Sequence, residues 1–250
     1  MDGASGSSRV IGATAFVLHT YPFRETSLIV EAFTHRYGRV AWVARGARRP
    51  GSALRGALLP FQPMSASWGG RGELRTLHKV EWLGGMPPLA ATPLVCGLYL
   101  NELLLKLLRR EDPHERVFDC YSEAIALLAG GAGISATLRR FERELLREIG
   151  YALVLEHEAQ TGEPIDPQRQ YEYRIGSGPV ALDGAQRVGD GIELRGQSLL
   201  DFAADRFTDP HSVQESKLLT RRVLAHYLGE QPLHTRELLH ALRGSSRAQD

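Results

Sequence analysis

The chain has 250 residues, of which 43% are hydrophobic and 24% are charged. This composition is ordinary for a soluble protein with a buried core, and the length suits one large domain or two small ones. No apolar run approaches the roughly 18 residues that a membrane-spanning helix needs, and residues 1–9 lack the layout of a secretion signal. Two cysteines are too few for a disulfide framework. We therefore expect a cytoplasmic protein with a flexible lead at 1–9.

Charge divides the chain into two parts. Residues 1–85 hold 11 Lys and Arg against 5 Asp and Glu, a net charge of +6. Residues 86–250 hold 19 against 24, a net charge of −5. A basic part followed by an acidic part indicates two domains with different partners. Charge alone leaves a second interpretation open, because small domains often carry a few excess charges.

The basic part predicts a small closed barrel. Apolar, β-branched runs are separated by polar or Gly-containing breaks, and "RYGR" at 36–39 has the glycine of a tight hairpin. A short helix is expected within 48–60. The five strands are expected at 10–19, 26–35, 39–45, 62–68 and 73–82. Three strands, a helical connection and two more strands are the order of an OB-type Greek-key barrel, in which strands 2–3 and adjoining loops bind oligonucleotides.

Strand alternation assigns side chains to the two faces of this barrel. On 73–82, one parity carries the apolar residues and is expected to point inward, while Arg75 and Lys79 point outward on one shared face. The inward set is Leu74, Val80 and Trp82. We interpret Trp42 as a core residue rather than a base-stacking platform. The same interpretation extends to Phe16, Phe33 and Phe61.

The stretch "ARGARRPGSALRGALLPFQP" at 44–63 follows the third strand and contains four arginines. They are Arg45, Arg48, Arg49 and Arg55. Guanidinium groups on a glycine-containing loop can reach phosphates together with backbone N–H donors. Such a surface binds nucleic acid through charge and counterion release, largely without reading sequence. A basic loop that contacts only solvent is the alternative.

The acidic part predicts a helical domain at 86–244, followed by a flexible tail at 245–250. Dense apolar or amphipathic stretches end at proline or glycine, as helices commonly do. Helices are expected at 92–113, 114–131, 135–151, 197–206, 212–229 and 235–243. The segment at about 156–195 is glycine-rich and is expected to be a loop insertion with short strands at "YEYRI" and "PVAL".

The helix at 135–151 has the clearest pattern in the chain. Its apolar face consists of Leu138, Phe141, Leu145 and Ile149. Ser135 is expected to cap its N-terminus and Gly150 to end it. A basic line runs beside the apolar face, with Arg139, Arg143 and Arg147 spaced by four and Arg140 next to them. An apolar groove edged by arginines suits an acidic, hydrophobic peptide; a solvated face, with Glu144 and Glu148 offsetting the charge, is the alternative.

Catalytic motifs are absent from the sequence. The chain has no HExxH, no GxxxxGK[ST] phosphate loop and no GxSxG elbow. His157 lies between Glu156 and Glu158, but a lone histidine among loop acids is usually just solvated. The two cysteines cannot make a Cys-rich zinc centre. We therefore expect a protein that is not an enzyme and that holds neither a metal nor a cofactor.

Several stretches, in order and across nearly the whole chain, resemble the RecO family of bacterial DNA repair and recombination mediators. They are "FVLHTYPFRETSLIVEAFTHRYGRV" (16–40), "VARGARR…LRGALLPFQP" (43–63), "GGRGELRTL" (69–77), "GLYLNELLLKLL" (97–108), "LRRFERELLREIGY" (138–151) and "YLGEQPLHTRELL" (227–239). No single stretch is diagnostic, but the ordered set is specific.

The resemblance implies an N-terminal OB domain and a helical C-terminal domain. It implies a protein that binds single- and double-stranded DNA, anneals complementary strands and helps to load the RecA recombinase onto DNA coated by single-stranded DNA-binding protein (SSB). The implied partners are the C-terminal tail of SSB, RecR and, in many bacteria, RecF. Many members carry a four-cysteine zinc motif in the later loop region. The matching stretch here, about 156–182, has no cysteine, so the chain resembles the zinc-free branch.

The resemblance also suggests where two partners bind. DNA binding is associated with the basic face of the OB domain, which here offers Arg24, Arg39, Arg45, Arg48, Arg49, Arg55, Arg71, Arg75 and Lys79. The helical domain is associated with the SSB tail, for which the candidates are Arg139, Arg140, Arg143 and Arg147. Two other functions stay open on the sequence: an OB-type RNA-binding module, and a protein-interaction scaffold whose basic loops bind acidic proteins.

Overall fold

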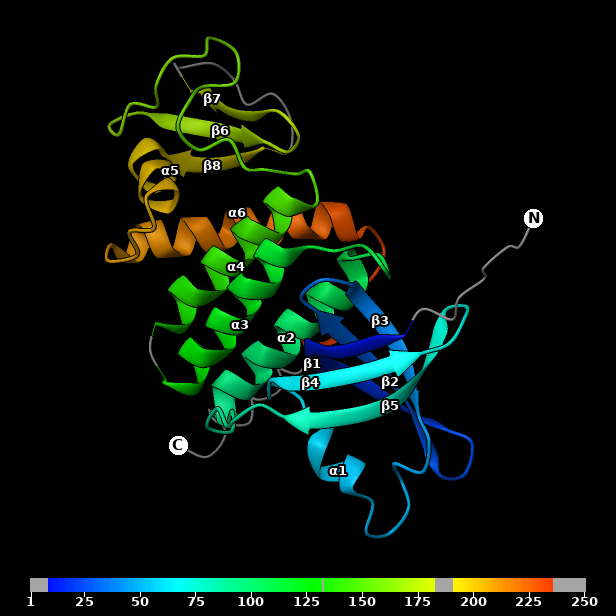
Figure 1. Cartoon of the computed structure of the whole chain (residues 1–250). Coiled ribbons are helices and arrows are strands. Elements are labelled where there is room, and N and C mark those ends of the chain that lie inside the picture. Colours follow the sequence, from blue (N-terminus) through cyan, green and yellow to red (C-terminus); the bar gives the residue numbers. More distant parts are fainter. Residues whose placement is uncertain (1–8, 132, 183–190, 236–250) are drawn as a thin grey trace, which may run out of the picture. The chain divides into compact units, whose positions relative to one another are not determined.

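The computed structural model of the chain describes residues 9–131, 133–182 and 191–235 (Figure 1). These residues form two compact units, divided between 132 and 133, and residues 233–235 return to the first unit. Residues 86–131 therefore group with the barrel, whereas the sequence assigns them to the helical domain; the predicted boundary at 85 stays a prediction. The predicted tail, most of the predicted lead and most of the helix expected at 235–243 lie outside the described residues.

The first unit is built on a closed five-stranded barrel, as the sequence predicts. Its strands pair in the order β1-β2-β3-β5-β4, and β1 also pairs with β4 to close the ring. Neighbours are antiparallel except β3 and β5, which are parallel. The elements are β1 (Val10–Phe23), β2 (Ser27–Thr34), β3 (Gly38–Ala44), α1 (Ala53–Ala57), β4 (Met64–Gly69) and β5 (Leu74–Trp82). This strand order confirms the OB-type topology.

Two helices cover part of the outer surface of the barrel: α2 (Ala91–Leu107) and α3 (Glu115–Ala129). Trp42 is fully buried inside the barrel, 5.0 Å from the ring of Trp68, so its interpretation as a core residue is confirmed. Phe16 and Phe33 are also buried, but they face outward against the ring of Phe118 on α3, at 5.5 and 5.4 Å. Because both faces of these strands are covered, their sequences are nearly continuous apolar runs.

A β-bulge at Leu18 changes the face on which the rest of β1 points. Val17 pairs with Ala32 and His19 with Glu31, so Leu18 has no partner across the ladder. An unpaired residue of this kind leaves backbone groups that need another partner. Asn101 on α2 supplies it by donating to the Leu18 carbonyl at 2.8 Å, and the Tyr121 hydroxyl on α3 donates to Asn101 Oδ1 at 2.6 Å. Burial raises the pKa of Tyr121, so its hydroxyl stays a donor.

A second bulge, at His78 in β5, overturns part of the predicted alternation. Leu77 pairs with Trp68 and Lys79 with Ser67, which leaves His78 as the extra residue. Parity therefore reverses along the strand. Leu77 takes the core position at 7% exposure, whereas Leu74, which was expected inside, is 41% exposed. Trp82, also expected inside, pairs with the buried Met64 but is 61% exposed as the last residue of the strand. Val80, the third, packs partly against the core. Arg75 and Lys79 lie on opposite sides of the bulge and do not share a face.

The helix α2 ends at Leu107, six residues before the proline that was expected to close it. A side chain of α2 also binds the last described residues of the chain. Glu102 accepts hydrogen bonds from the amides of His234 and Thr235 and from the Thr235 hydroxyl, at 2.9, 3.0 and 2.6 Å. Burial raises the pKa of Glu102, but these hydrogen bonds and the one from Lys106 outweigh it and lower the pKa to about 2. The carboxylate is therefore charged at neutral pH and holds the returning segment.

The second unit combines three helices with a small sheet. Its elements are α4 (Ile134–Glu148), β6 (Gln170–Arg174), β7 (Gly178–Ala181), β8 (Ile192–Arg195), α5 (Gly196–Ala203) and α6 (Pro210–Leu228). The strands pair antiparallel in the order β7-β6-β8. The sequence predicts β6 and β7 but places β8 in a loop. The N-cap of α4 is Gly133 in a left-handed conformation, not Ser135, while Gly150 follows the helix end as expected.

We predict that the buried Asn101 side chain is a main source of stability in the first unit. Replacing it by leucine removes the hydrogen bonds to the Leu18 carbonyl and from the Tyr121 hydroxyl, at about 1–3 kcal/mol for each, so Asn101→Leu should lower the free energy of unfolding by about 2–6 kcal/mol. Tyr121→Phe, the matched control, removes only one of the two bonds and should cost less. Urea unfolding measures both, and an unchanged midpoint for Asn101→Leu would contradict the assignment.

Candidate nucleic-acid interface

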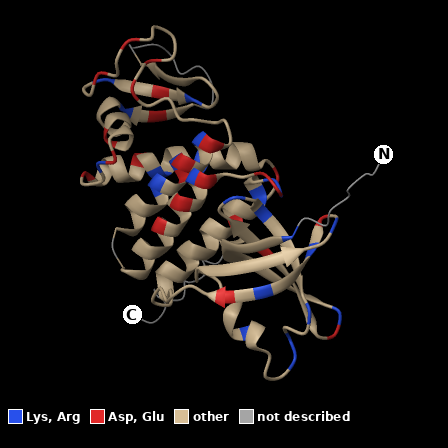
Figure 2. Ribbon diagram, in the orientation of Figure 1, with Lys and Arg blue, Asp and Glu red and all other residues tan. Residues whose placement is uncertain are grey.

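Five of the nine candidate DNA-binding residues gather at one end of the barrel. The turn after β1, the end of β3 and the helix α1 all lie at this end, because β1 and β3 run in the same direction. We call it the basic end, and its arginines are Arg24, Arg45, Arg48, Arg49 and Arg55, all exposed. Figure 2 shows Lys and Arg in the loop beside α1, on α1 itself and in the turn between β1 and β2.

Backbone hydrogen bonds join the two loops of the basic end. The amide of Arg48 donates to the carbonyl of Thr26 at 2.9 Å, and the Arg48 guanidinium donates to the carbonyl of Arg24 at 3.3 Å. The Arg49 amide donates to Gly46 at 3.1 Å, in a turn for which Gly46 takes a φ of +69°. A positive φ favours glycine. Arginines from separate parts of the sequence are therefore held in one region by the backbone.

Charge is concentrated at the basic end. Residues 24–26 and 45–57 contain five arginines and one acid, Glu25. Among the described residues, none of the five arginines forms an ion pair. Their guanidinium groups can therefore bind an anion without giving up an internal carboxylate. A guanidinium fork matches the oxygens of a phosphate, and its charge releases the counterions of a nucleic acid.

The other four candidates lie elsewhere. Arg71 is exposed in the hairpin between β4 and β5, at the opposite end of the barrel. Arg75 is half-buried and donates to Glu111 at 2.6 Å and to the Gly70 carbonyl at 2.7 Å. Lys79 is exposed and pairs with Glu81 at 2.7 Å. These residues do not join the basic end.

Arg39 has a role inside the fold of the first unit. Its guanidinium donates to the carbonyls of Leu105 and Leu108, where α2 ends, and its Nε lies 3.5 Å from Glu31. The last carbonyls of a helix have no partner within the helix, and a cation suits that end. Glu31 is only 3% exposed and also pairs with Arg110. Burial lowers the pKa of Arg39, although Glu31 raises it.

The four arginines expected to bind an acidic peptide have different surroundings in the second unit. Arg139 is 4% exposed and pairs with Glu142 on the same helix. Arg143 donates to the carbonyls of Phe202 and Ala203 at the end of α5. Arg140 is exposed and lies 3.7 Å from Asp205. Arg147 is exposed and pairs with Glu144. The predicted basic line is therefore largely occupied by acids and carbonyls of its own unit.

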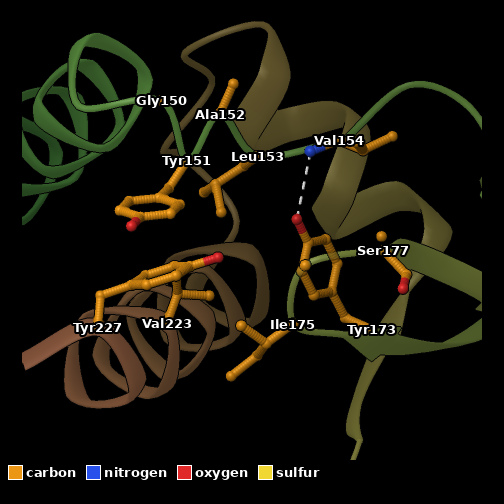
Figure 3. Close-up of a pocket in the computed structure, with 12 residues that line it drawn as sticks. Gly150, Tyr151, Ala152, Leu153, Val154, Tyr173, Ile175, Ser177, Val223 and Tyr227 are labelled. Atoms are coloured by element: carbon orange, nitrogen blue, oxygen red, sulfur yellow. Dashed lines mark hydrogen bonds between the residues drawn. The ribbon is translucent and has the colours of Figure 1, made fainter. Parts of the chain in front are cut away.

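A pocket of about 300 Å³ lies in the second unit, beyond the end of α4 (Figure 3). It begins at Gly150, whose amide donates to the Arg147 carbonyl, and the rings of Tyr151 and Tyr227 stack on one side of it at 3.6 Å. On the other side the Tyr173 hydroxyl accepts from the amide of Val154 at 3.2 Å, and burial raises the pKa of Tyr173 to about 12. The lining side chains are mostly apolar or aromatic and none is charged, so the pocket suits an uncharged group.

No pattern in the sequence indicates that these pocket residues come together. Tyr151 follows the end of α4, and Tyr227 lies on α6, more than 70 residues later in the chain. The glycine-rich segment Gly176–Gly178 completes the lining between β6 and β7. Only the fold of the unit places these residues side by side.

The cysteine-free stretch 156–182 is held by hydrogen bonds around one buried carboxylate. Glu158 accepts from the Thr161 hydroxyl at 3.0 Å and from the Ala181 amide at 3.2 Å.

The described residues contain no group of three or more His, Cys, Asp or Glu side chains placed to hold a metal ion. In the part of the chain that the structure describes, no helix is both long and apolar enough to cross a bilayer.

Two family models match the chain. The one described as Recombination protein O N terminal matches residues 9–86, and the one described as Recombination protein O C terminal matches residues 91–237. The chain belongs to the RecO family. The RecO N-terminal match covers the whole described barrel, and the C-terminal match begins at the first residue of α2.

Relatives over most of the chain carry the same family name. The DNA repair protein RecO of Nitrosospira multiformis is 53% identical over 225 residues, which cover 90% of this chain and 93% of the relative. The DNA repair protein RecO of Dechloromonas aromatica is 49% identical and covers 94% of this chain and 98% of its own length. The DNA repair protein RecO of Aromatoleum aromaticum is 48% identical, and the match covers 96% of this chain and 99% of the relative. The resemblance found in the sequence is thereby confirmed.

Proposed function

We propose that this RecO-family protein acts in DNA repair by binding single- and double-stranded DNA through the basic end of its barrel and annealing complementary strands. The observation that carries the proposal is the gathering of five exposed arginines, without ion pairs among the described residues, at one end of an OB-type barrel. OB-type barrels commonly bind oligonucleotides. The relatives named above are DNA repair proteins, which makes DNA the expected nucleic acid.

Annealing follows from the same charge. Two complementary strands repel each other through their phosphates, and a basic surface that holds both neutralises this charge and raises their local concentration. The contacts have to stay labile so that bases can search for their register. Loop arginines without a tight base pocket allow that exchange. Annealing needs no chemical step, so we propose that the protein is not an enzyme and uses no cofactor.

The proposed mediator role brings in further partners. Bound to the acidic, hydrophobic C-terminal tail of SSB, the protein would be delivered to coated DNA, where it would help RecA to load together with RecR; RecF is a further candidate partner. In the second unit, Arg147 is an exposed cation that pairs with Glu144, and it lies three residues before Gly150, the first residue of the uncharged pocket. A peptide with both acidic and apolar residues matches that pair of features.

Of the two predictions from the proposed function, the first concerns the basic end. Replacing Arg45, Arg48 and Arg49 together by glutamine removes three phosphate contacts, each worth a slope of about 0.7 in the dependence of log affinity on log salt for single strands. The variant should bind a single-stranded oligonucleotide at least tenfold more weakly at low salt, with a slope smaller by about 2. Fluorescence anisotropy over a salt series measures both quantities.

A charge-matched control uses three exposed arginines outside the basic end: Arg109, Arg221 and Arg222. Their replacement by glutamine changes the net charge of the protein equally but should leave the slope within about 0.5 of the wild-type value. Equal losses in the two triple variants would mean that only overall charge matters. An unchanged affinity in the first variant would show that the basic end is not the DNA surface.

The second prediction concerns the SSB tail. A synthetic peptide of that tail should bind the whole protein, and both Arg147→Ala and Tyr227→Ala should weaken it about tenfold, because one removes the cation and the other the apolar wall. Arg221→Ala, on the same helix as Tyr227 but outside the pocket lining, is the control. Titration calorimetry gives the affinities. Peptide binding that neither Arg147→Ala nor Tyr227→Ala affects would place the tail elsewhere.

A further inference from the structure

The outer face of β1, β2 and β3 has two halves. In one half, Phe16 and Phe33 are buried against Phe118 of α3. In the other half, Tyr21 pairs with Ile29 across the ladder, and Ile29 pairs with Val43. Tyr21 is 45% exposed, and its two neighbours are only half-buried. An aromatic and aliphatic surface is thus open beside the helix-covered half. We call it the Tyr21 face: Tyr21, Ile29, Val43 and His19.

The bulge at Leu18 is the reason that Tyr21 lies on this face. Val17 points into the barrel core, and without a bulge His19 and Tyr21, two and four residues later, would point inward as well. Leu18 adds one residue to the strand, so His19 pairs with the outward-facing Glu31 and Tyr21 with Ile29. Bulges re-aim side chains in this way. The His19 and Tyr21 rings lie 4.4 Å apart, edge to face.

The Tyr21 face adjoins the basic end. β1 ends at Phe23, whose ring lies 5.1 Å from the guanidinium of Arg24, and Arg45 comes two residues after Val43 with the same parity. Arg48 binds the carbonyl of Arg24. An apolar aromatic surface therefore continues directly into a group of arginines without ion pairs among the described residues. On the other side lies Ala41, which pairs with Glu31 and lines a cavity of about 280 Å³ beside Arg110.

We propose that the Tyr21 face is a base-stacking surface for single-stranded DNA, with Tyr21 as the residue that distinguishes single strands from duplex. This inference rests on the proposed function. An exposed aromatic ring beside cations fits single strands, because unpaired bases offer flat faces for stacking while phosphates bind the arginines. In a duplex the base faces are covered by their neighbours, so a duplex has only its phosphates to offer. Stacking is tolerant of sequence, as annealing requires.

The test compares variants of the whole protein on matched DNA. Tyr21→Ala should weaken binding of a single-stranded oligonucleotide about tenfold and leave binding of a duplex of equal length within twofold. The salt dependence should be unchanged, because Tyr21 contacts no phosphate. Tyr21→Phe should bind like wild type, since the ring is retained. Tyr37→Ala is the matched control, a 41%-exposed tyrosine in the hairpin between β2 and β3, and should bind single strands like wild type.

A second measurement begins with the wild-type protein alone. An oligonucleotide with abasic sites keeps its phosphates but loses the faces that stack, so wild-type protein should bind it several-fold more weakly than the intact strand. Tyr21→Ala should show a smaller difference between the two strands, which is a coupling between the ring and the bases. Equal binding of intact and abasic strands by wild type would overturn the proposal, as would an unchanged single-strand affinity in Tyr21→Ala.

The outcomes separate a failure of the proposed function from a failure of the stacking surface alone. If wild-type protein binds neither single strands nor duplex, the proposed function fails and this inference with it. If the basic-end variant loses DNA affinity while Tyr21→Ala keeps it, the basic end stands and the stacking surface is wrong. Equal loss of single-strand and duplex affinity in Tyr21→Ala would also overturn the inference, because a stacking residue has no reason to affect duplex.

Discussion

The hydrogen bond between Asn101 and the carbonyl of Leu18 is the contact on which the first unit depends. β1 has to pack against helices near Phe16 and present a different surface near Tyr21, and one extra residue between them makes both possible. The bulge that does so leaves a carbonyl without a ladder partner in a buried place, and the side chain from α2 satisfies it. The same bond fixes α2, and through Tyr121 also α3, against the barrel. Fold and candidate interface thus share one local irregularity.

The arginines divide into two kinds by their partners. Arg39 and Arg143 bind the last carbonyls of α2 and α5, where a fixed cation satisfies acceptors that the helix leaves open. Arg48 and Arg49 stand on loops whose backbone makes its own turns, and among the described residues their side chains have no acid to bind. A guanidinium of the first kind is committed to the fold. One of the second kind is available for the phosphates of a ligand.

Much of the architecture could be predicted from the sequence because it follows from long, regular patterns. The strand order of the barrel, the helix at 135–151 and its end at Gly150 all appear in the periodicity and in the glycines. Bulges do not: one inserted residue at Leu18 or His78 reverses the parity of everything beyond it, so Leu74, which shares its parity in the sequence with the core-packed Val80, is exposed. The hydrogen bonds from Arg39 to the end of α2 could not be predicted for another reason: they join residues more than 60 positions apart in the sequence.

The proposed function requires the basic end to hold two strands at once and so to speed their annealing. The most direct measurement is the annealing rate of complementary strands, bare and SSB-coated, over a range of salt concentrations. We expect faster annealing of both, with an acceleration that weakens as salt rises, because phosphate contacts carry it. If the protein increased the annealing rate on neither substrate, the proposed function would be wrong.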